Sequence, residues 1–163
     1  MFANQVRAFR RTSSIVICLL LAGCAHDFYQ QRADMIQQHG EAFNANLKAD
    51  RFEAAIFENE QIEEIASQVM ESIKKRSQPL PENQVDREWK LLKTAVDAAV
   101  KNWLALGQRL TIMKKYDQAR AAYQRVIETY TGDSERIYRE RAVRAKRDLD
   151  ILSPPLSESA PGS

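Results

Sequence analysis

Few residues in the chain have side chains that could build a catalytic or metal site. There are two cysteines, Cys18 and Cys24, and two histidines, His26 and His39, in 163 residues. The histidines are not spaced as paired metal ligands are, and the sequence contains no HExxH, no phosphate-binding glycine loop and no GxSxG. We therefore predict no catalytic residue, no metal site and no cofactor, and no small-molecule substrate is evident.

Cys24 has a different chemical role, which the residues before it indicate. Residues 1–11 carry three arginines and no acid, and residues 15–22 form an apolar run. That run is far shorter than the roughly 20 residues that span a bilayer. A basic segment followed by a short apolar segment is typical of a secretory signal peptide. Small residues at 22 and 23 would let a peptidase reach the bond before Cys24.

The sequence Leu21-Ala22-Gly23-Cys24 resembles the lipobox, the processing site of bacterial lipoproteins. The resemblance implies that residues 1–23 are removed and that residues 24–27 form a short lipidated N-terminus. Acylated Cys24 would then anchor the protein in a membrane, because each buried CH2 contributes about 0.8 kcal/mol. In this family an Asp directly after the cysteine favours the inner membrane. Here Ala25 follows, which implies the outer membrane, facing the periplasm, in a Gram-negative cell. The alternative is an ordinary signal peptide, or a membrane anchor without a lipid, with a chance cysteine.

Removal of the signal segment would leave a nearly neutral chain. The full sequence has 24 basic residues against 22 acidic ones, and three of the basic residues lie in residues 1–23. A nearly neutral protein has no electrostatic basis for binding nucleic acid. Cys18 would leave with the signal segment and Cys24 would be acylated, so the mature protein would have no free thiol and no disulfide. Cysteine catalysis and Cys-ligated zinc are thereby excluded.

The spacing of apolar residues predicts an all-α domain of about five helices over residues 28–152. Residues 28–48 and 52–75 carry apolar side chains in alternating steps of 3 and 4, which is typical of one helix face. Residues 77–81, with two prolines, then break the chain. No segment shows the strict alternation of a half-buried strand. Residues 153–163, rich in Pro and Ser, are predicted to be a disordered tail.

The third predicted helix has the most regular pattern in the sequence. We expect Asn83 to cap it, and its apolar stripe runs on the order of 40 Å at about 1.5 Å per residue. The period favours a long, heptad-patterned helix within a bundle. The stripe consists of Val85, Trp89, Leu92, Val96, Ala99, Trp103, Leu106, Leu110 and Met113.

Two shorter helices are predicted to follow as antiparallel neighbours. The fourth spans about residues 117–130 and is expected to end with Gly132 in the C′ position. The fifth is expected to start from a cap at Asp133 or Ser134. Its apolar stripe extends to Leu152.

The hairpin of the third and fourth helices carries small residues at a recognisable spacing. Trp103, Gly107, Ala119 and Tyr123 lie within residues 100–133, and this window resembles a tetratricopeptide repeat. Glycine inside a helix costs about 1 kcal/mol relative to alanine. We therefore expect Gly107 and Ala119 to form a close helix crossing, with Trp103 and Tyr123 beside it. A generic antiparallel hairpin is the alternative.

Other positions leave the repeat assignment open. Leu110 stands where the family usually has Tyr, and Thr131 stands where it usually has Pro. Residues 36–55 show a weaker similarity to the same repeat, in which Gly40 corresponds to Gly107. The turn between the two helices is there expected to be about three residues longer than usual. One repeat is too few for a solenoid, so we expect a compact bundle or assembly with a partner.

The resemblance also implies a binding face on the first helix of the repeat. Some tetratricopeptide domains clamp a carboxylate there with Lys and Asn, and of the corresponding residues in this chain only Lys101 could contribute. Leu104 and Ile112 lie off the apolar stripe and must find a second surface. We predict that Lys101, Leu104, Gln108 and Ile112 bind a protein segment through a more apolar contact.

Two functions from different classes remain open. One is a non-enzymatic scaffold or adaptor that is anchored through Cys24 and binds an envelope protein. The other is an enzyme or accessory factor acting on cell-wall material, for which Glu71-Ser72 gives a faint resemblance to lytic transglycosylases. Converging carboxylates in a cleft would favour the enzyme, and an apolar or mixed groove would favour the scaffold. We interpret the acidic run Glu58, Glu60, Glu63 and Glu64 as a solvated helix face, and we prefer the scaffold.

Overall fold

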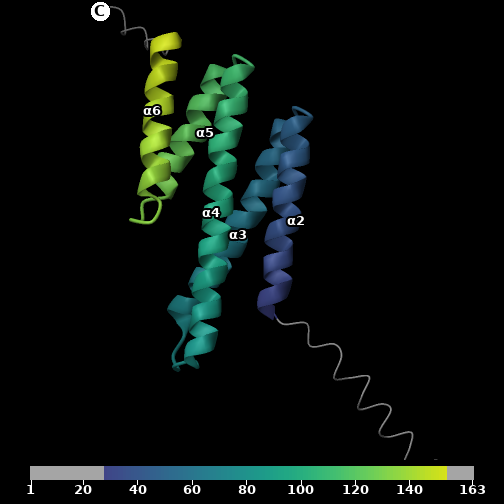
Figure 1. Ribbon diagram of the computed structural model, residues 1–163, viewed down its shortest axis with the longest axis vertical. Helices are drawn as coiled ribbons and strands as arrows, with labels where there is room; N and C mark the ends of the chain where they lie inside the picture. The colour runs from purple at the N-terminus through teal and green to yellow at the C-terminus, as the bar shows by residue number, and fades with distance from the viewer. Residues whose placement is uncertain (1–27, 154–163) are drawn as a thin grey trace, which may run out of the picture.

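The computed structural model describes residues 28–153, and this region is all-α (Figure 1). It contains five helices and no strand, which confirms the predicted fold class. The helices are α2 (Phe28–Lys48), α3 (Phe52–Lys75), α4 (Glu82–Ile112), α5 (Tyr116–Thr129) and α6 (Arg136–Leu152). The predicted signal segment, the predicted lipidation site at Cys24 and the predicted tail beyond Ser153 lie outside the described residues.

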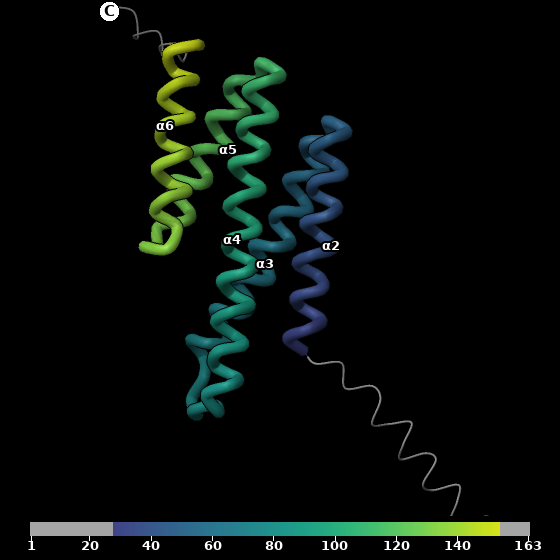
Figure 2. Tube along the Cα trace, viewed as in Figure 1, coloured from purple at the N-terminus to yellow at the C-terminus, as the bar shows by residue number. Residues whose placement is uncertain are grey.

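Successive helices run in alternating directions, and each packs against the next (Figure 2). The 31-residue α4 is central: it contacts α3 and α5, its neighbours in the chain, and also α2 and α6. In Figure 1, α2 and α6 lie on opposite sides of α4, and α5 and α6 lie beside its C-terminal half. Helix α4 therefore joins an N-terminal helix pair to a C-terminal one.

This central position explains where the predicted apolar stripe of α4 is right and where it is wrong. Trp89 belongs to the predicted stripe but is 51% exposed, and Met113 is also exposed. Leu91, off the stripe, is buried in the core. Neighbours on several sides bury a wider face than the narrow seam of a coiled coil. The stripe residues that are buried are Leu92, Ala99, Trp103, Leu106 and Leu110.

Two helices start at other residues than the predicted caps. Helix α4 has Pro81 at its N-cap, and the Pro81 carbonyl oxygen accepts two backbone N–H groups of the first turn. Asn83 therefore lies inside the helix. Helix α6 has Glu135 at its N-cap, so neither Asp133 nor Ser134 occupies that position. Neither cap residue makes a side-chain hydrogen bond to the helix backbone.

The end of α5 also differs from the prediction of a C′ glycine. Tyr130 is the C-cap, and Gly132 does not have a positive φ. Arg139, from α6, instead donates from Nη1 to the carbonyl oxygens of Tyr130 and Gly132 at 2.7 and 2.6 Å. A side chain from the next helix, and not a left-handed glycine, therefore holds the chain where it leaves α5.

The α2–α3 and α4–α5 turns have the same backbone conformation. Asp50 and Lys114 occupy equivalent positions, with φ of 57° and 58°. In both turns the amide of the next residue donates to the carbonyl five residues back at 2.9 Å. The expectation of a longer upstream turn is therefore wrong. Matching the turns aligns Gly107 with Phe43 and not with Gly40, so the two glycines do not correspond.

Candidate functional site

Three of the four residues predicted to bind protein lie together. Lys101, Leu104 and Gln108 on α4 line a hollow of about 430 Å³ between α4, α5 and α6. Ile112 is 65% exposed and does not line this hollow, because it is the last residue of α4. We call the hollow the α4–α6 groove. Its other lining residues are Ala105 on α4, Tyr123 on α5, and Arg141 and Ala145 on α6.

The α4–α6 groove has an apolar floor and a cationic rim. Leu104 and Ala145 are half-buried and pack against the core, and Tyr123 is almost fully buried. Lys101 and Arg141 are exposed, and neither forms an ion pair with any residue in 28–153. Two uncompensated positive charges beside an apolar surface suit a segment that carries both apolar and acidic side chains.

Gly107 determines where the Tyr123 ring lies. A Cβ atom at position 107 would be 2.6 Å from Tyr123 Cε1, which is far inside van der Waals contact. The Tyr123 ring therefore fills the space that a side chain at position 107 would need. The close crossing of Gly107 with Ala119 stays a prediction. Ala119 itself is fully buried. Burial also raises the pKa of the Tyr123 hydroxyl above its ordinary value.

The opposite side of the same hairpin is fixed by Glu63 on α3. Its Oε1 accepts the indole N–H of Trp103 at 2.8 Å and the hydroxyl of Tyr130 at 2.5 Å. Its Oε2 accepts Arg125 Nη2 at 2.9 Å. Burial and the neighbouring Glu63 carboxylate raise the pKa of Tyr130 well above its ordinary value. Glu63 therefore links three helices and positions both α4 and α5.

The interpretation of residues 58–64 as a solvated acidic face is therefore wrong at two positions. Glu63 is largely buried, and Glu58 Oε2 lies 2.7 Å from His39 Nδ1 on α2. The apolar pattern gave no sign of this, because the partners of Glu63 lie 40 or more positions later in the chain. Unpaired donors on predicted inner faces, such as the Trp103 indole, are the signal that could have indicated a buried acceptor.

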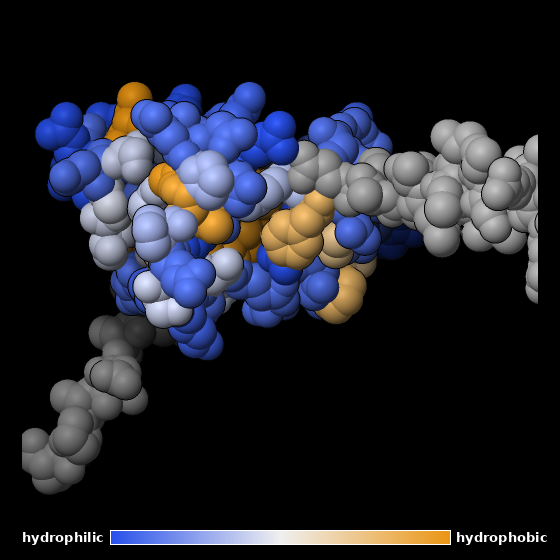
Figure 3. Space-filling model, turned by 90° about the horizontal axis from the view of Figure 1, so that it is seen from below, coloured by the Kyte–Doolittle hydropathy of each residue, from blue (hydrophilic) through white to orange (hydrophobic). Residues whose placement is uncertain are grey.

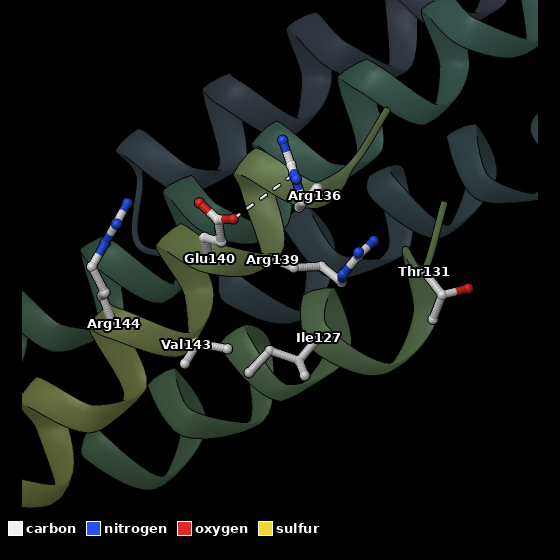
Figure 4. A pocket seen from close by; sticks show the side chains of 7 residues that line it. All are labelled: Ile127, Thr131, Arg136, Arg139, Glu140, Val143 and Arg144. Atoms are coloured by element: carbon white, nitrogen blue, oxygen red, sulfur yellow. Dashed lines mark ion pairs between the residues drawn. The ribbon is translucent and has the colours of Figure 1, made fainter. Parts of the chain in front are cut away.

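A second hollow, of about 570 Å³, lies between α5 and α6 and was not expected from the sequence (Figure 4). Ile127 and Val143 lie close to each other in it, and Arg136 pairs with Glu140 at 3.9 Å. Arg144 is also part of its lining. Neither hollow brings two carboxylates together, since the first has none in its lining and the second has only Glu140.

Other groups with possible chemistry do not converge. Glu71 and Ser72 are both exposed on α3. No group of three or more His, Cys, Asp or Glu side chains is arranged to hold a metal ion in residues 28–153. Nor does this region contain a helix of sufficient length and apolarity to cross a bilayer.

Comparison of the chain with protein-family models, with curated proteins and with solved structures finds no significant match.

Proposed function

We propose that the protein is a lipid-anchored, non-enzymatic scaffold that binds a segment of another envelope protein in the α4–α6 groove. The observation that carries this proposal is the lining of the groove, which combines a half-buried apolar floor with two cations that form no ion pair within residues 28–153. A mixed groove of this kind suits a protein segment. Paired carboxylates, which would favour an enzyme acting on cell-wall material, are found neither in the α4–α6 groove nor in the hollow between α5 and α6.

The proposed architecture is a pair of tetratricopeptide-like hairpins. Two features support it. The α2–α3 and α4–α5 turns share a backbone conformation, with Asp50 and Lys114 in equivalent positions. The Gly107–Tyr123 contact supplies the close packing that the resemblance implies for the second hairpin. On this interpretation the α4–α6 groove is the concave face.

The proposed anchor is Cys24, in the outer membrane and facing the periplasm if the cell is Gram-negative. The support is the basic segment, the short apolar run and the sequence Leu21-Ala22-Gly23-Cys24. Cys24→Ser should abolish incorporation of labelled palmitate and move the protein out of the membrane fraction. A variant that is still processed and still membrane-bound would contradict the anchor.

Binding is tested by placing a photo-crosslinking amino acid at Gln108 in the full chain expressed in cells. Gln108 is exposed and lines the groove, so its crosslinker should join the chain to one protein partner. The matched control is Gln118 on α5, which is exposed and does not line the groove. Crosslinks of equal yield from both positions, or none from position 108, would contradict a partner in the groove.

A further inference from the structure

The start of α2 and the α3–α4 turn lie at one end of the molecule, and the α4–α6 groove lies toward the other (Figure 1). Side chains hold the first end together. Glu88 near the start of α4 pairs with Arg76 at the end of α3, and Tyr29 donates its hydroxyl to Glu88 Oε1 at 3.5 Å. We call this the anchor end and define it by Phe28, residues 76–81 and Trp89.

The chain between the proposed lipid and the anchor end is very short. Only residues 25–27 separate Cys24 from Phe28. A fully extended chain spans at most about 3.6 Å per residue, so Cys24 lies no more than about 14 Å from Phe28 in any conformation. The polar headgroup region is itself about 5–8 Å thick on each side of a bilayer. An acylated Cys24 would therefore keep Phe28, at the anchor end, close to the lipid surface.

The side chains at the anchor end suit that surface. Phe28 and Trp89 are 56% and 51% exposed, and aromatic rings of this kind favour the interface between lipid and water. The Arg32 guanidinium lies 4.5 Å from the centre of the Phe28 ring. Lys90 and Lys93 are also exposed. Figure 3 shows the molecule from this end, where hydrophobic residues lie among hydrophilic ones.

We propose that the anchor end rests in the headgroup layer of a phospholipid membrane, with Phe28 and Trp89 inserted among the headgroups. This inference depends on the proposed acylation of Cys24, but it adds a protein–lipid contact that the acyl chains alone do not require. This position of the anchor end in the headgroup layer, which we call the seating, directs the α4–α6 groove away from the membrane. A partner would then be bound from the far side, not along the lipid surface.

The two tryptophans of the chain provide a direct test. Trp89 is at the anchor end, whereas Trp103 is buried and lies about 21 Å farther along α4 at about 1.5 Å per residue. The mature acylated protein is reconstituted in vesicles of phosphatidylcholine and phosphatidylglycerol that contain a doxyl-labelled lipid. Quenching of tryptophan emission is compared between wild type and Trp89→Phe, and flotation of the vesicles reports anchoring. Wild type should lose most of its Trp89 emission, and Trp89→Phe should be quenched little.

The outcomes separate the lipid contact from the anchor. If the protein floats with the vesicles but wild type and Trp89→Phe are quenched equally, the anchor stands and the seating is overturned. If the protein does not float, both are overturned. If Trp89 quenching depends on the density of protein in the vesicle and not on the lipid, a second copy covers the anchor end. The seating is then again overturned.

Reversing the charge of two lysines at the anchor end provides a second test, in which both aromatic side chains are kept. Lys90→Glu with Lys93→Glu should reduce Trp89 quenching in the anionic vesicles, because reversed charges repel the surface. The matched control is Arg144→Glu with Arg147→Glu, on α6 and away from the anchor end, which should leave quenching unchanged. An equal reduction by both pairs would overturn the seating.

Discussion

Arg109 and Asp50 form a bidentate ion pair that joins the last turn of α4 to the α2–α3 turn. Arg109 Nε lies 2.8 Å from Asp50 Oδ1, and Nη2 lies 3.1 Å from Oδ2, although the two residues are 59 positions apart. Beside this pair, Lys115 Nζ lies 4.6 Å from the centre of the Phe52 ring. The two turns of equal conformation therefore contact each other, and the contact joins the two hairpins at the end remote from Phe28.

The Arg109–Asp50 pair should make stability depend on pH. The hydrogen bond from Arg109 holds the pKa of Asp50 below its ordinary value. A lowered folded-state pKa stabilises the protein above the unfolded pKa of about 3.9, and this contribution is lost as the pH falls through the folded value. Asp50→Asn removes the charge and keeps a residue that tolerates the positive φ. Urea unfolding should show the variant less stable at pH 7 and the difference shrinking toward pH 3.

A difference between wild type and Asp50→Asn that stays constant from pH 7 to pH 3 would contradict this ion-pair contribution. Arg109→Gln is the matched control for the other partner. It should show the same loss of stability at pH 7, and it should remove the pH dependence that Asp50 contributes.

The two helix-interior glycines should respond in opposite directions to the same substitution. Nothing lies within 4 Å of a Cβ at Gly40, so Gly40→Ala should stabilise the protein by up to about 1 kcal/mol. A Cβ at Gly107 would meet the Tyr123 ring, so Gly107→Ala should destabilise it by about 1–3 kcal/mol. Thermal unfolding measures both. Repeating Gly107→Ala in a Tyr123→Leu background should reduce its cost, and an unchanged cost would show that the ring is not the obstacle.

These two glycines show which features of the structure can be predicted from the sequence and which cannot. Apolar spacing predicts the helices of the described region well, because one buried face per helix is enough to produce the period. It cannot tell Gly40 from Gly107, since both are glycines inside a predicted helix and only the tertiary contact distinguishes them. An alignment that matches Gly40 with Gly107 therefore shifts one hairpin by three residues relative to the other. The turns would have aligned them correctly, because Asp50 and Lys114 are each followed by a basic residue and then an aromatic one.

The candidate groove was predictable on one helix only. Lys101, Leu104 and Gln108 lie on one face of α4 by helical geometry, so their shared position follows from spacing. Arg141 on α6 was missed, because the helix–helix packing that brings α6 across from α4 leaves no local pattern. For the same reason an acidic run could not reveal that Glu63 is largely buried and that Glu60 is exposed.

Glu63 should be far more important to stability than its neighbour Glu60. Glu63→Ala leaves the indole of Trp103 and the hydroxyl of Tyr130 without an acceptor, and an unsatisfied buried donor costs about 1–3 kcal/mol. Glu60→Ala, at an exposed position of the same helix, should change stability by no more than about 0.5 kcal/mol. Urea unfolding followed by circular dichroism compares the two variants. Equal effects would show that the hydrogen bonds to Glu63 contribute nothing.

Charge reversal at the rim of the α4–α6 groove should weaken partner binding and leave the fold intact. Lys101 and Arg141 are exposed and unpaired in the described region, so Lys101→Glu with Arg141→Glu should change unfolding stability by about 0.5 kcal/mol or less. An acidic partner segment would be repelled, so crosslinking from position 108 should fall severalfold, and in wild type it should weaken as salt is raised. Arg144→Glu with Arg147→Glu provides the control, because neither residue lines the groove. If the control pair reduces crosslinking as much as the rim pair does, the partner recognises the net charge of α6 and not the groove. If neither pair reduces it, the cationic rim has no part in recognition.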